Sequence, residues 1–350
     1  MPDVLDFFNS DAFSETNLTL YVNRTPWVPS FLGGLGLFEA QGVALNSFYL
    51  ERNTTGIELV QSRPRNTPGQ PLTRDTRQAI SYPIPHLYQE DAVSADEVQG
   101  LKALGMNLGL EDVQAVANRK LDKMAIQNDA THEFHRVGAF MGIVLDADGS
   151  TLINLYTQTG ASQPSLVAWD IANSLEADLI AAVDLVRRTM EDTLQMGGQT
   201  VGQLIALCGD TFFDLLKTHS AVRQSYIDWQ AAAANNMGMF GQSGDFLRNS
   251  WVYNSFVWNG VLWHNYRGTN PNTGSKMIPL AEAYFAPSVP GLFHVRYGPR
   301  NKISGVNEIG LPRYASSMVV DDKYVKLEYE SNPAYFCSRP EVLYRATSAA

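Results

Sequence analysis

Two histidines in His132-Glu133-Phe134-His135 form the first pattern in this sequence that could bind a metal ion. Histidines three residues apart share one face of a helix, and Glu-x-x-His pairs of this spacing occur in carboxylate metal sites. A zinc peptidase helix instead carries His-Glu-x-x-His, in which the ligands are four residues apart. Because the spacing differs and no third ligand is evident, we interpret both histidines as structural helix residues.

Four acids, Glu90, Asp91, Asp96 and Glu97, lie within eight residues. Paired carboxylates can perform general acid–base catalysis, which is the first interpretation. The order Ser94-Ala95-Asp96-Glu97 also matches a helix capping box, in which serine and glutamate each bond a backbone N–H at the helix start. We favour the cap. In a third interpretation these acids face arginines on another copy of the chain.

Other patterns resemble functional motifs but lack a defining feature. Asp146-x-Asp148-Gly149 does not place glycine and glutamate where a calcium loop needs them, so it predicts a hairpin turn. Gly241-Gln242-Ser243-Gly244-Asp245 lacks the last glycine of a nucleophile elbow. Five aromatic residues between 251 and 266 could stack on a sugar or a base, but a sheet core or a subunit contact is the favoured interpretation: Trp251, Tyr253, Trp258, Trp263 and Tyr266. The motifs predict no catalytic residue and no cofactor.

The composition argues against other classes of function. The chain has 350 residues, a net charge of -10 and only 18% charged residues, below the usual level of about 25%. Nucleic-acid affinity depends largely on Lys and Arg, so sequence-specific DNA binding is not expected. Little charge is available to coat a free surface, which indicates that much of the surface lies against other protein. Cys208 and Cys337 are interpreted as buried hydrophobic residues in a reducing compartment.

The elements around these motifs predict an α+β fold with mixed sheets. Apolar residues recur at helical spacing over 109–142 and 175–194, and helical sequence resumes over about 201–229. Hairpins are expected over 143–156 and around Asn259-Gly260, a strong turn signal. Further strands are expected at 281–285, 293–297, 314–320 and 324–329. The acidic N-terminus predicts no export signal, and no run is apolar enough to span a membrane.

Two segments do not look able to fold alone. Residues 1–40 read as an extended arm, rich in aromatic residues without periodicity, and residues 1–51 carry a charge of about -5. Residues 42–90 read as a long two-stranded excursion, whose part from 52 to 77 has five arginines against two acids. An isolated hairpin is marginal in water. We expect the arm to dock on other protein. The excursion either lies on a neighbouring subunit, which we favour, or is a disordered, solvated loop.

Several blocks of sequence resemble the major capsid proteins of tailed bacteriophages, in the lambda-type protein E family. The most specific blocks are Ala95–Gly100 and Asp129–Ala139, and others follow in order along the chain: Leu35–Phe38, Val144–Thr151, Gly310–Ala315 and Arg339–Leu343. The resemblance implies the HK97-like capsid fold. It implies an N-terminal arm at 1–41, an E-loop at 42–89, and a P-domain at 90–199 with a spine helix at about 109–142. It also implies an A-domain at 200–312 and P-domain return strands at 313–350.

For function, the resemblance implies self-assembly into the hexamers and pentamers of an icosahedral head that encloses the phage genome. The expected interface residues are E-loop arginines and arm aromatics: Arg63, Arg65, Arg74, Arg77, Phe7, Phe8, Phe13 and Trp27. Their acidic partners would be Glu90, Asp91, Asp96 and Glu97. Lysine crosslinking from the E-loop is not expected, because residues 25–101 contain no Lys.

Further partners follow from the same resemblance. The chain begins at once with the arm, so we expect a separate scaffolding protein, together with a portal and a decoration protein. Packaged DNA would be enclosed without sequence-specific binding, no membrane would be involved, and the virion would assemble in the host cytoplasm. Two alternatives stay open. One is another phage structural protein, such as a tail tube or connector subunit. The other is a hydrolase that uses Asp96 and Glu97 or the pair His132 and His135.

Overall fold

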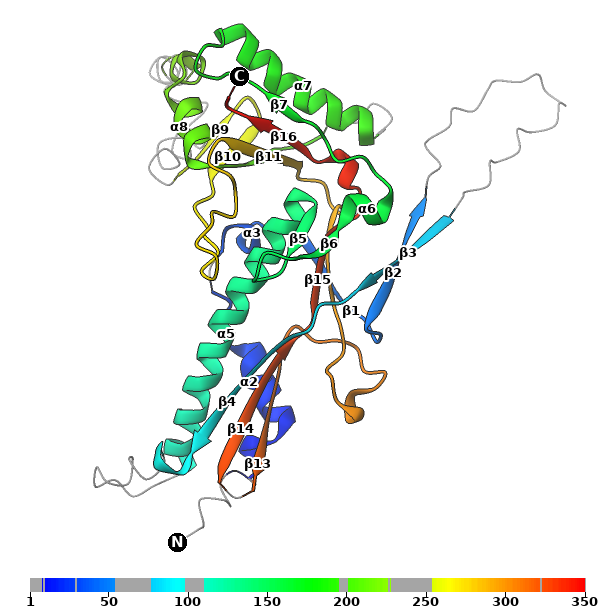
Figure 1. Ribbon diagram of the computed structural model, residues 1–350, viewed down its shortest axis with the longest axis vertical. Helices are drawn as coiled ribbons and strands as arrows, with labels where there is room; N and C mark the ends of the chain where they lie inside the picture. Colours follow the sequence, from blue (N-terminus) through cyan, green and yellow to red (C-terminus); the bar gives the residue numbers. More distant parts are fainter. Residues whose placement is uncertain are drawn as a thin grey trace, which may run out of the picture. The chain divides into compact units, whose positions relative to one another are not determined.

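The computed structural model describes residues 8, 10–28, 30–53, 77–97, 110–194, 201–225, 227, 254–321 and 323–349 (Figure 1). The chain divides into two compact units. The first comprises Met1–Tyr49, Ser81–Arg136 and Phe293–Tyr335, and the second comprises Leu50–Ile80, Val137–Leu292 and Phe336–Ala350. Each unit is therefore built from segments that are far apart in the sequence. The predicted return segment, 313–350, contributes strands to both.

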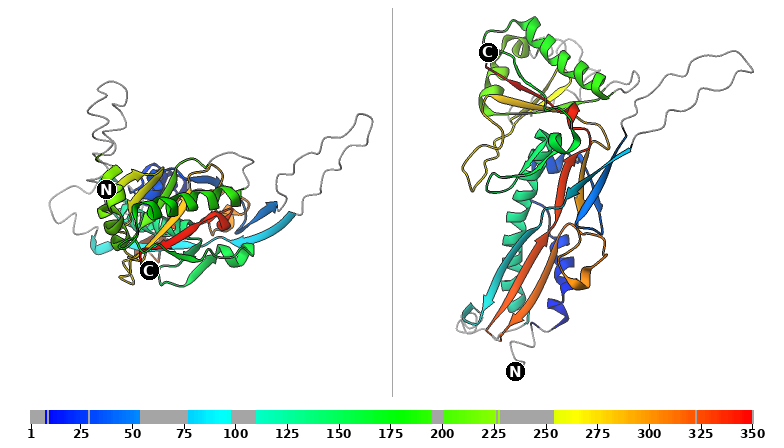
Figure 2. Two further views of the ribbon diagram at one scale, coloured as in Figure 1. Left: turned by 90° about the horizontal axis from the view of Figure 1, so that it is seen from above. Right: turned by 45° about the vertical axis from the view of Figure 1, so that its right-hand side comes forward.

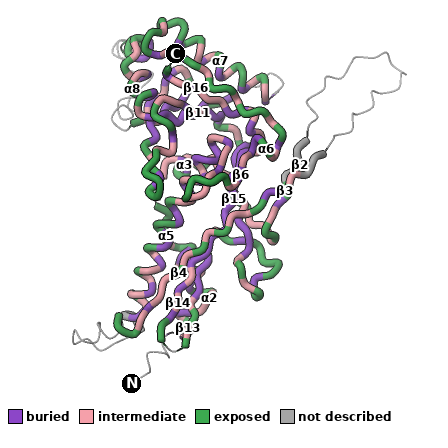
Figure 3. Tube along the Cα trace, viewed as in Figure 1, coloured by how far each residue is buried: buried purple, intermediate pink, exposed green. Residues whose placement is uncertain are grey.

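The first unit is organised around the helix α5 (Leu110–Met141), whose prediction at 109–142 is confirmed. A three-stranded antiparallel sheet accompanies it, in the order β13 (Tyr314–Val320), β14 (Tyr324–Ser331) and β4 (Leu87–Ser94). Alternate residues of β14 are buried in a core shared with α5, as expected for a sheet with one buried face (Figure 3).

In its described residues the N-terminal segment forms helices rather than an extended arm, which corrects the prediction made for residues 1–40. It forms η1 (Asp11–Phe13), α2 (Glu15–Arg24) and α3 (Phe31–Gly34). The Ser14 side chain caps α2 by accepting a hydrogen bond from the Asn17 N–H. Leu18 and Val22, four residues apart, face the core that contains α5. This short apolar stripe on a ten-residue helix was the signal that the sequence analysis missed.

Two smaller sheets are also present. One has the order β1 (Phe38–Gly42), β12 (Phe293–Tyr297) and β15 (Pro333–Cys337), with β1 parallel to β12. The other pairs β2 (Ser47–Asn53) with β3 (Arg77–Pro83). These two strands form the base of the predicted E-loop excursion, whose remainder lies outside the described residues.

The second unit contains a six-stranded mixed sheet. Its order is β7 (Leu166–Ala168), β16 (Tyr344–Thr347), β11 (Glu282–Pro287), β8 (Leu204–Cys208), β10 (Val261–Asn265) and β9 (Ser255–Trp258). The helices α7 (Glu176–Leu194) and α8 (Asp210–Thr218) pack on its core, in which Trp263 is fully buried. The predicted helix at 175–194 is confirmed. The aromatic hairpin is a sheet core as favoured, with Trp258, Trp263 and Tyr266 buried and Trp251 and Tyr253 outside the described residues.

The predicted helical stretch over 201–229 is partly wrong, because Leu204–Cys208 is a strand. Every residue of this strand is buried, so its sequence is a continuous apolar run without alternation. Periodicity cannot distinguish such a run from a piece of buried helix. The nearby glycines, Gly202 and Gly209, were the cue for a strand of only five residues.

The two predicted hairpins are confirmed. Asn259 and Gly260, with φ values of 48° and 71°, join the antiparallel strands β9 and β10, as a primed turn requires. The turn at 146–149 joins β5 (Ile143–Leu145) to β6 (Thr151–Asn154), and the short helix α6 (Leu155–Thr159) follows. No helix within the described part of the chain is long and apolar enough to cross a membrane.

Both cysteines are buried and free, as predicted. Burial raises the pKa of the Cys208 thiol well above its usual value and that of the Cys337 thiol to about 12. A protonated, buried thiol is a poor nucleophile. Both residues therefore serve as small core side chains.

Candidate functional site

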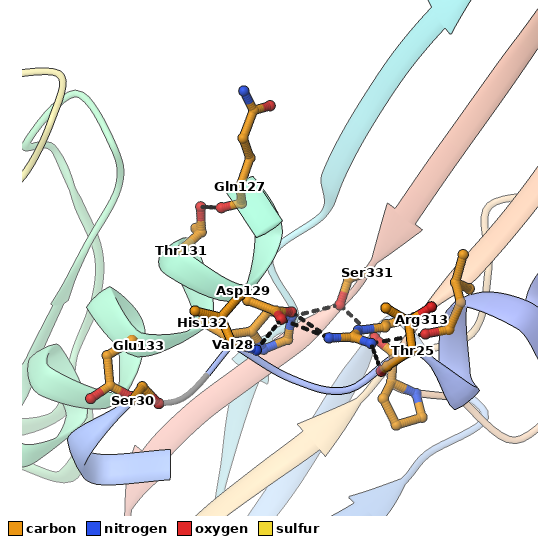
Figure 4. Close-up of polar contacts among 12 residues, drawn as sticks. Thr25, Val28, Ser30, Gln127, Asp129, Thr131, His132, Glu133, Arg313 and Ser331 are labelled. Atoms are coloured by element: carbon orange, nitrogen blue, oxygen red, sulfur yellow. Dashed lines mark hydrogen bonds and ion pairs between the residues drawn. The ribbon is translucent and has the colours of Figure 1, made fainter. Parts of the chain in front are cut away.

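A connected cluster of polar side chains in the first unit lies where the N-terminal segment meets α5 (Figure 4). Asp129 and Glu133 stand one helical turn apart on α5, and both are buried. Their spacing of four residues places both carboxylates on one side of the helix. Both accept hydrogen bonds from backbone N–H groups of the N-terminal segment: from Val28 to Asp129 at 2.9 Å, and from Leu32 to Glu133 at 2.9 Å.

Arg313, just before β13, neutralises Asp129. Its Nη2 donates to both carboxylate oxygens, at 2.6 and 2.8 Å. Its Nη1 donates to the carbonyl oxygens of Val22 and Thr25, both at 2.8 Å, where α2 ends. The side chain of Arg313 is fully buried. One guanidinium therefore donates both to carbonyl oxygens at the C-terminal end of α2 and to the Asp129 carboxylate of α5. This arrangement uses the planar, multidentate geometry of arginine, which lysine lacks.

Trp27, from the N-terminal segment, lies against the guanidinium of this ion pair. The guanidinium of Arg313 lies 3.8 Å from the centre of the Trp27 ring, and the His132 ring meets it edge-on at 5.0 Å. The indole is 36% exposed. A cation against an indole face gains electrostatic attraction, which is larger when water is excluded. Trp27, predicted as an assembly residue, thus contacts its own subunit through one face of the ring.

His132 is held by two hydroxyl groups and is fully buried. Ser331 donates its hydroxyl proton to the Pro312 carbonyl oxygen at 2.6 Å, so its oxygen accepts from Nε2 of His132 at 2.9 Å. Nδ1 of His132 then accepts from the Tyr335 hydroxyl at 2.8 Å. Burial, with the nearby Arg136, lowers the pKa of His132 well below its usual value.

Both ring nitrogens of His132 are therefore bonded to side chains of the same subunit. His135 is also fully buried. Among the described residues, no three His, Cys, Asp or Glu side chains gather closely enough to hold a metal ion. Sequence reasoning named His132 but missed Asp129 and Arg313, although both lie inside the blocks that carried the family resemblance.

Two other arm residues named from the sequence, Phe8 and Phe13, lie in the core of their own subunit. Phe8 and Phe13 are buried, with ring centroids 4.8 Å apart, in the cluster that includes α2 and α5. Phe7 lies outside the described residues. So do three of the four E-loop arginines, Arg63, Arg65 and Arg74, while Arg77 begins β3 with its side chain outside the description.

Glu90 and Asp91 lie within β4, and Asp96 and Glu97 follow its end. Three of these four acids pair with lysines of the same chain. Glu90 pairs with Lys326, which lowers the pKa of Glu90. Asp91 and Glu97 lie 3.5 and 2.9 Å from the Lys120 ammonium. Asp96 is exposed.

The capping box at the end of β4 is confirmed. The Glu97 N–H donates to the Ser94 hydroxyl at 3.4 Å, and the Ser94 N–H donates to the Glu97 carboxylate at 3.3 Å. These reciprocal bonds are the defining contacts of the motif. Ser94 and Glu97 therefore have a structural role, as the cap of a helix start.

The substitution Asp129→Asn tests how strongly the cluster stabilises the subunit. It leaves the buried Arg313 guanidinium without its counter-charge, so we expect the free energy of unfolding to fall by about 3–5 kcal/mol. Glu97→Gln is the matched control, because it removes an exposed ion pair but keeps a capping-box residue, and its effect should stay within about 1 kcal/mol. Urea denaturation of the unassembled subunit measures both. Equal urea midpoints for the two variants would show that the buried pair Asp129–Arg313 stabilises the subunit no more than an exposed ion pair does.

The buried His132 predicts a dependence of stability on pH. Its folded pKa is depressed, so its contribution is complete above the unfolded value of about 6.5. Below that pH the unfolded chain binds a proton that the folded chain does not, and stability falls by up to about 1.4 kcal/mol per pH unit. Unfolding midpoints from pH 8 to pH 5 should therefore fall less steeply for His132→Gln. Parallel curves for the two proteins would show that His132 does not titrate in this way.

Comparison with known proteins identifies the family. The model of the phage major capsid protein E family matches residues 14–348. The major capsid protein of Salmonella phage Felix O1 is 25% identical over 351 residues, covering 95% of each chain. The major capsid protein of Pseudomonas phage KPP10 is 26% identical over 349 residues, covering 96% of this chain and 97% of that protein.

Solved structures show the same fold at low identity. A putative capsid protein of an Escherichia coli CFT073 prophage is similar with a TM-score of 0.56 and 13% identity, covering 96% of this chain and 99% of that one. A phage-related protein from Bordetella bronchiseptica RB50 has a TM-score of 0.50 and 12% identity, covering 96% and 97%. These similarities support the predicted HK97-like α+β fold. The family match across residues 14–348 shows that the chain belongs to the phage major capsid protein E family.

Proposed function

We propose that this chain is the repeating subunit of a phage capsid shell and acts by binding other copies of itself. The observation that carries the proposal is the family match over almost the whole chain. Hexamers and pentamers of an icosahedral head are the expected assemblies, enclosing packaged DNA without sequence-specific contacts. The role is structural and needs no cofactor.

The distribution of charge supports contacts between E-loops and neighbouring subunits. The segment from 52 to 77 has three more basic than acidic residues. Near the end of β4, the four acids of the cluster and Glu328 outnumber Lys120 and Lys326, which pair with them. The side chains of Glu90, Asp91 and Glu97 remain 55%, 42% and 44% exposed. This acidic excess suits the E-loop arginines of another copy.

The proposal extends to other virion proteins. A separate scaffolding protein would direct assembly in the host cytoplasm, a portal would occupy one vertex, and a decoration protein would bind the outer surface. The chain would reside in the virion.

Electron microscopy of the expressed protein, with and without a co-expressed scaffolding protein, tests the proposed function. We expect closed shells when the scaffold is present. Open rings or tubes would support a connector or tail-tube subunit, and dispersed single chains under both conditions would contradict a shell subunit.

Reversing two E-loop charges tests the proposed ionic contacts. The double variant Arg63→Glu, Arg65→Glu should give several-fold fewer shells, because each exposed pair, worth only about 0–1 kcal/mol, is repeated at every subunit of the lattice. The double Lys variant keeps both charges and should assemble. Circular dichroism of the two variants should be unchanged. A normal shell yield from the Glu variant would exclude this role for the arginines.

A further inference from the structure

The loop over 298–312, which joins β12 to β13 in the first unit, exposes an unusual run of large aliphatic side chains. Ile303 is 96% exposed, Ile309 71% and Val306 67%. Leu45, 59% exposed, lines the same hollow as Ile303 and Val306. Soluble monomers rarely expose a contiguous apolar patch of more than a few hundred Å². Patches above that size mark interaction sites.

Hydrogen bonds anchor the backbone of this loop to the rest of the first unit. The Asn301 N–H donates to the buried Glu330 carboxylate at 2.8 Å, and the Gly310 N–H donates to the Val43 carbonyl oxygen at 3.0 Å. A Cβ on Gly310 would overlap the Tyr297 and Gly298 carbonyl oxygens, so the loop lies directly against β12. The apolar side chains are thus held outward before any partner binds. Such preorganisation lowers the entropic cost of association.

The charges around the loop are mostly satisfied among themselves, with an acidic excess. Arg300 pairs with Glu15 and Glu308, and Lys302 pairs with Glu15 and Glu328. Two bases therefore stand among three acids. This apolar surface with an acidic border suits a partner surface that is apolar and basic.

The exposed stripe of α5 has that character. Ala115, Arg119, Lys123, Ile126 and Ala130 follow one another at intervals of three or four residues, and all are exposed. Ile126 is a large aliphatic side chain, 57% exposed, with Lys123 nearly one turn before it. The helix and the loop lie on opposite sides of the sheet β13–β14–β4 in two views (Figures 1 and 2).

We propose that the 298–312 loop of one subunit docks on the exposed stripe of α5 in a second copy of this chain. Complementary charge selects the partner, with acids around the loop and Arg119 and Lys123 on the helix, and Ile303 meets the apolar part of the stripe near Ile126. Because the two surfaces differ and lie at opposite sides of the unit, the contact is head-to-tail and repeats from subunit to subunit. The inference rests on the proposed function as a shell subunit.

Cysteine crosslinking in assembled shells tests this contact. The double variant Ile303→Cys, Ile126→Cys has both new thiols at exposed positions, while the native Cys208 and Cys337 are buried. Shells purified from cells that co-express a scaffolding protein are treated with a short bis-maleimide and run on a denaturing gel. We expect a ladder of linked chains from the double variant. Each single variant is the matched control and should remain monomeric on the gel.

The possible outcomes separate this contact from the proposed function. Shells of the double variant without a ladder would overturn the contact and leave the shell function intact. A dimer from Ile303→Cys alone would show that loop meets loop, which also overturns it. If the unaltered chain forms no shells, the proposed function fails and the contact fails with it. Thermal melting of the unassembled variants should match the parent, because both side chains are exposed.

Discussion

A buried arginine–aspartate pair holds the first unit together. Arg313 and Asp129 are 184 residues apart in the sequence, and their charges are removed from water together. Burying either charge alone would cost several kcal/mol, so each requires the other. Nη1 of the guanidinium donates to carbonyl oxygens at the end of α2, and the Asp129 carboxylate also accepts from the Val28 N–H. Three chain segments are therefore fixed by one set of charge-assisted hydrogen bonds.

This cluster changes how the N-terminal segment is understood. The sequence suggested an arm whose core lies in neighbouring subunits. In the structure, α2 packs on α5 and β13 of the same chain, and Glu133 also anchors the backbone at Leu32 and Gly33. Because the segment docks within its own subunit, the conformational entropy of ordering it is lost during folding. Association between subunits therefore does not have to offset that loss. The arm from residue 10 to 34 is thus largely part of the folded subunit.

Interfaces between copies must then use surfaces that folding leaves exposed. The 298–312 loop and the outer stripe of α5 meet this requirement, because their backbones are fixed while their apolar and charged side chains face solvent. The acids at the end of β4 keep large exposed fractions despite their lysine partners. Several modest contacts suit a shell, in which weak contacts are repeated many times.

The sequence alone determined the elements whose signals are local. Helix periodicity located α5 and α7, the Asn259-Gly260 pair located a hairpin, and Ser94 with Glu97 located a cap. Tertiary structure alone decided which charges are buried. Arg313 and Asp129 look like ordinary surface residues in the sequence, because ion pairing over 184 residues leaves no periodic trace. The same holds for Leu204–Cys208, since burial on both faces removes the alternation that identifies a strand. Local order follows from neighbours along the chain, whereas burial depends on which distant segments come to cover a residue.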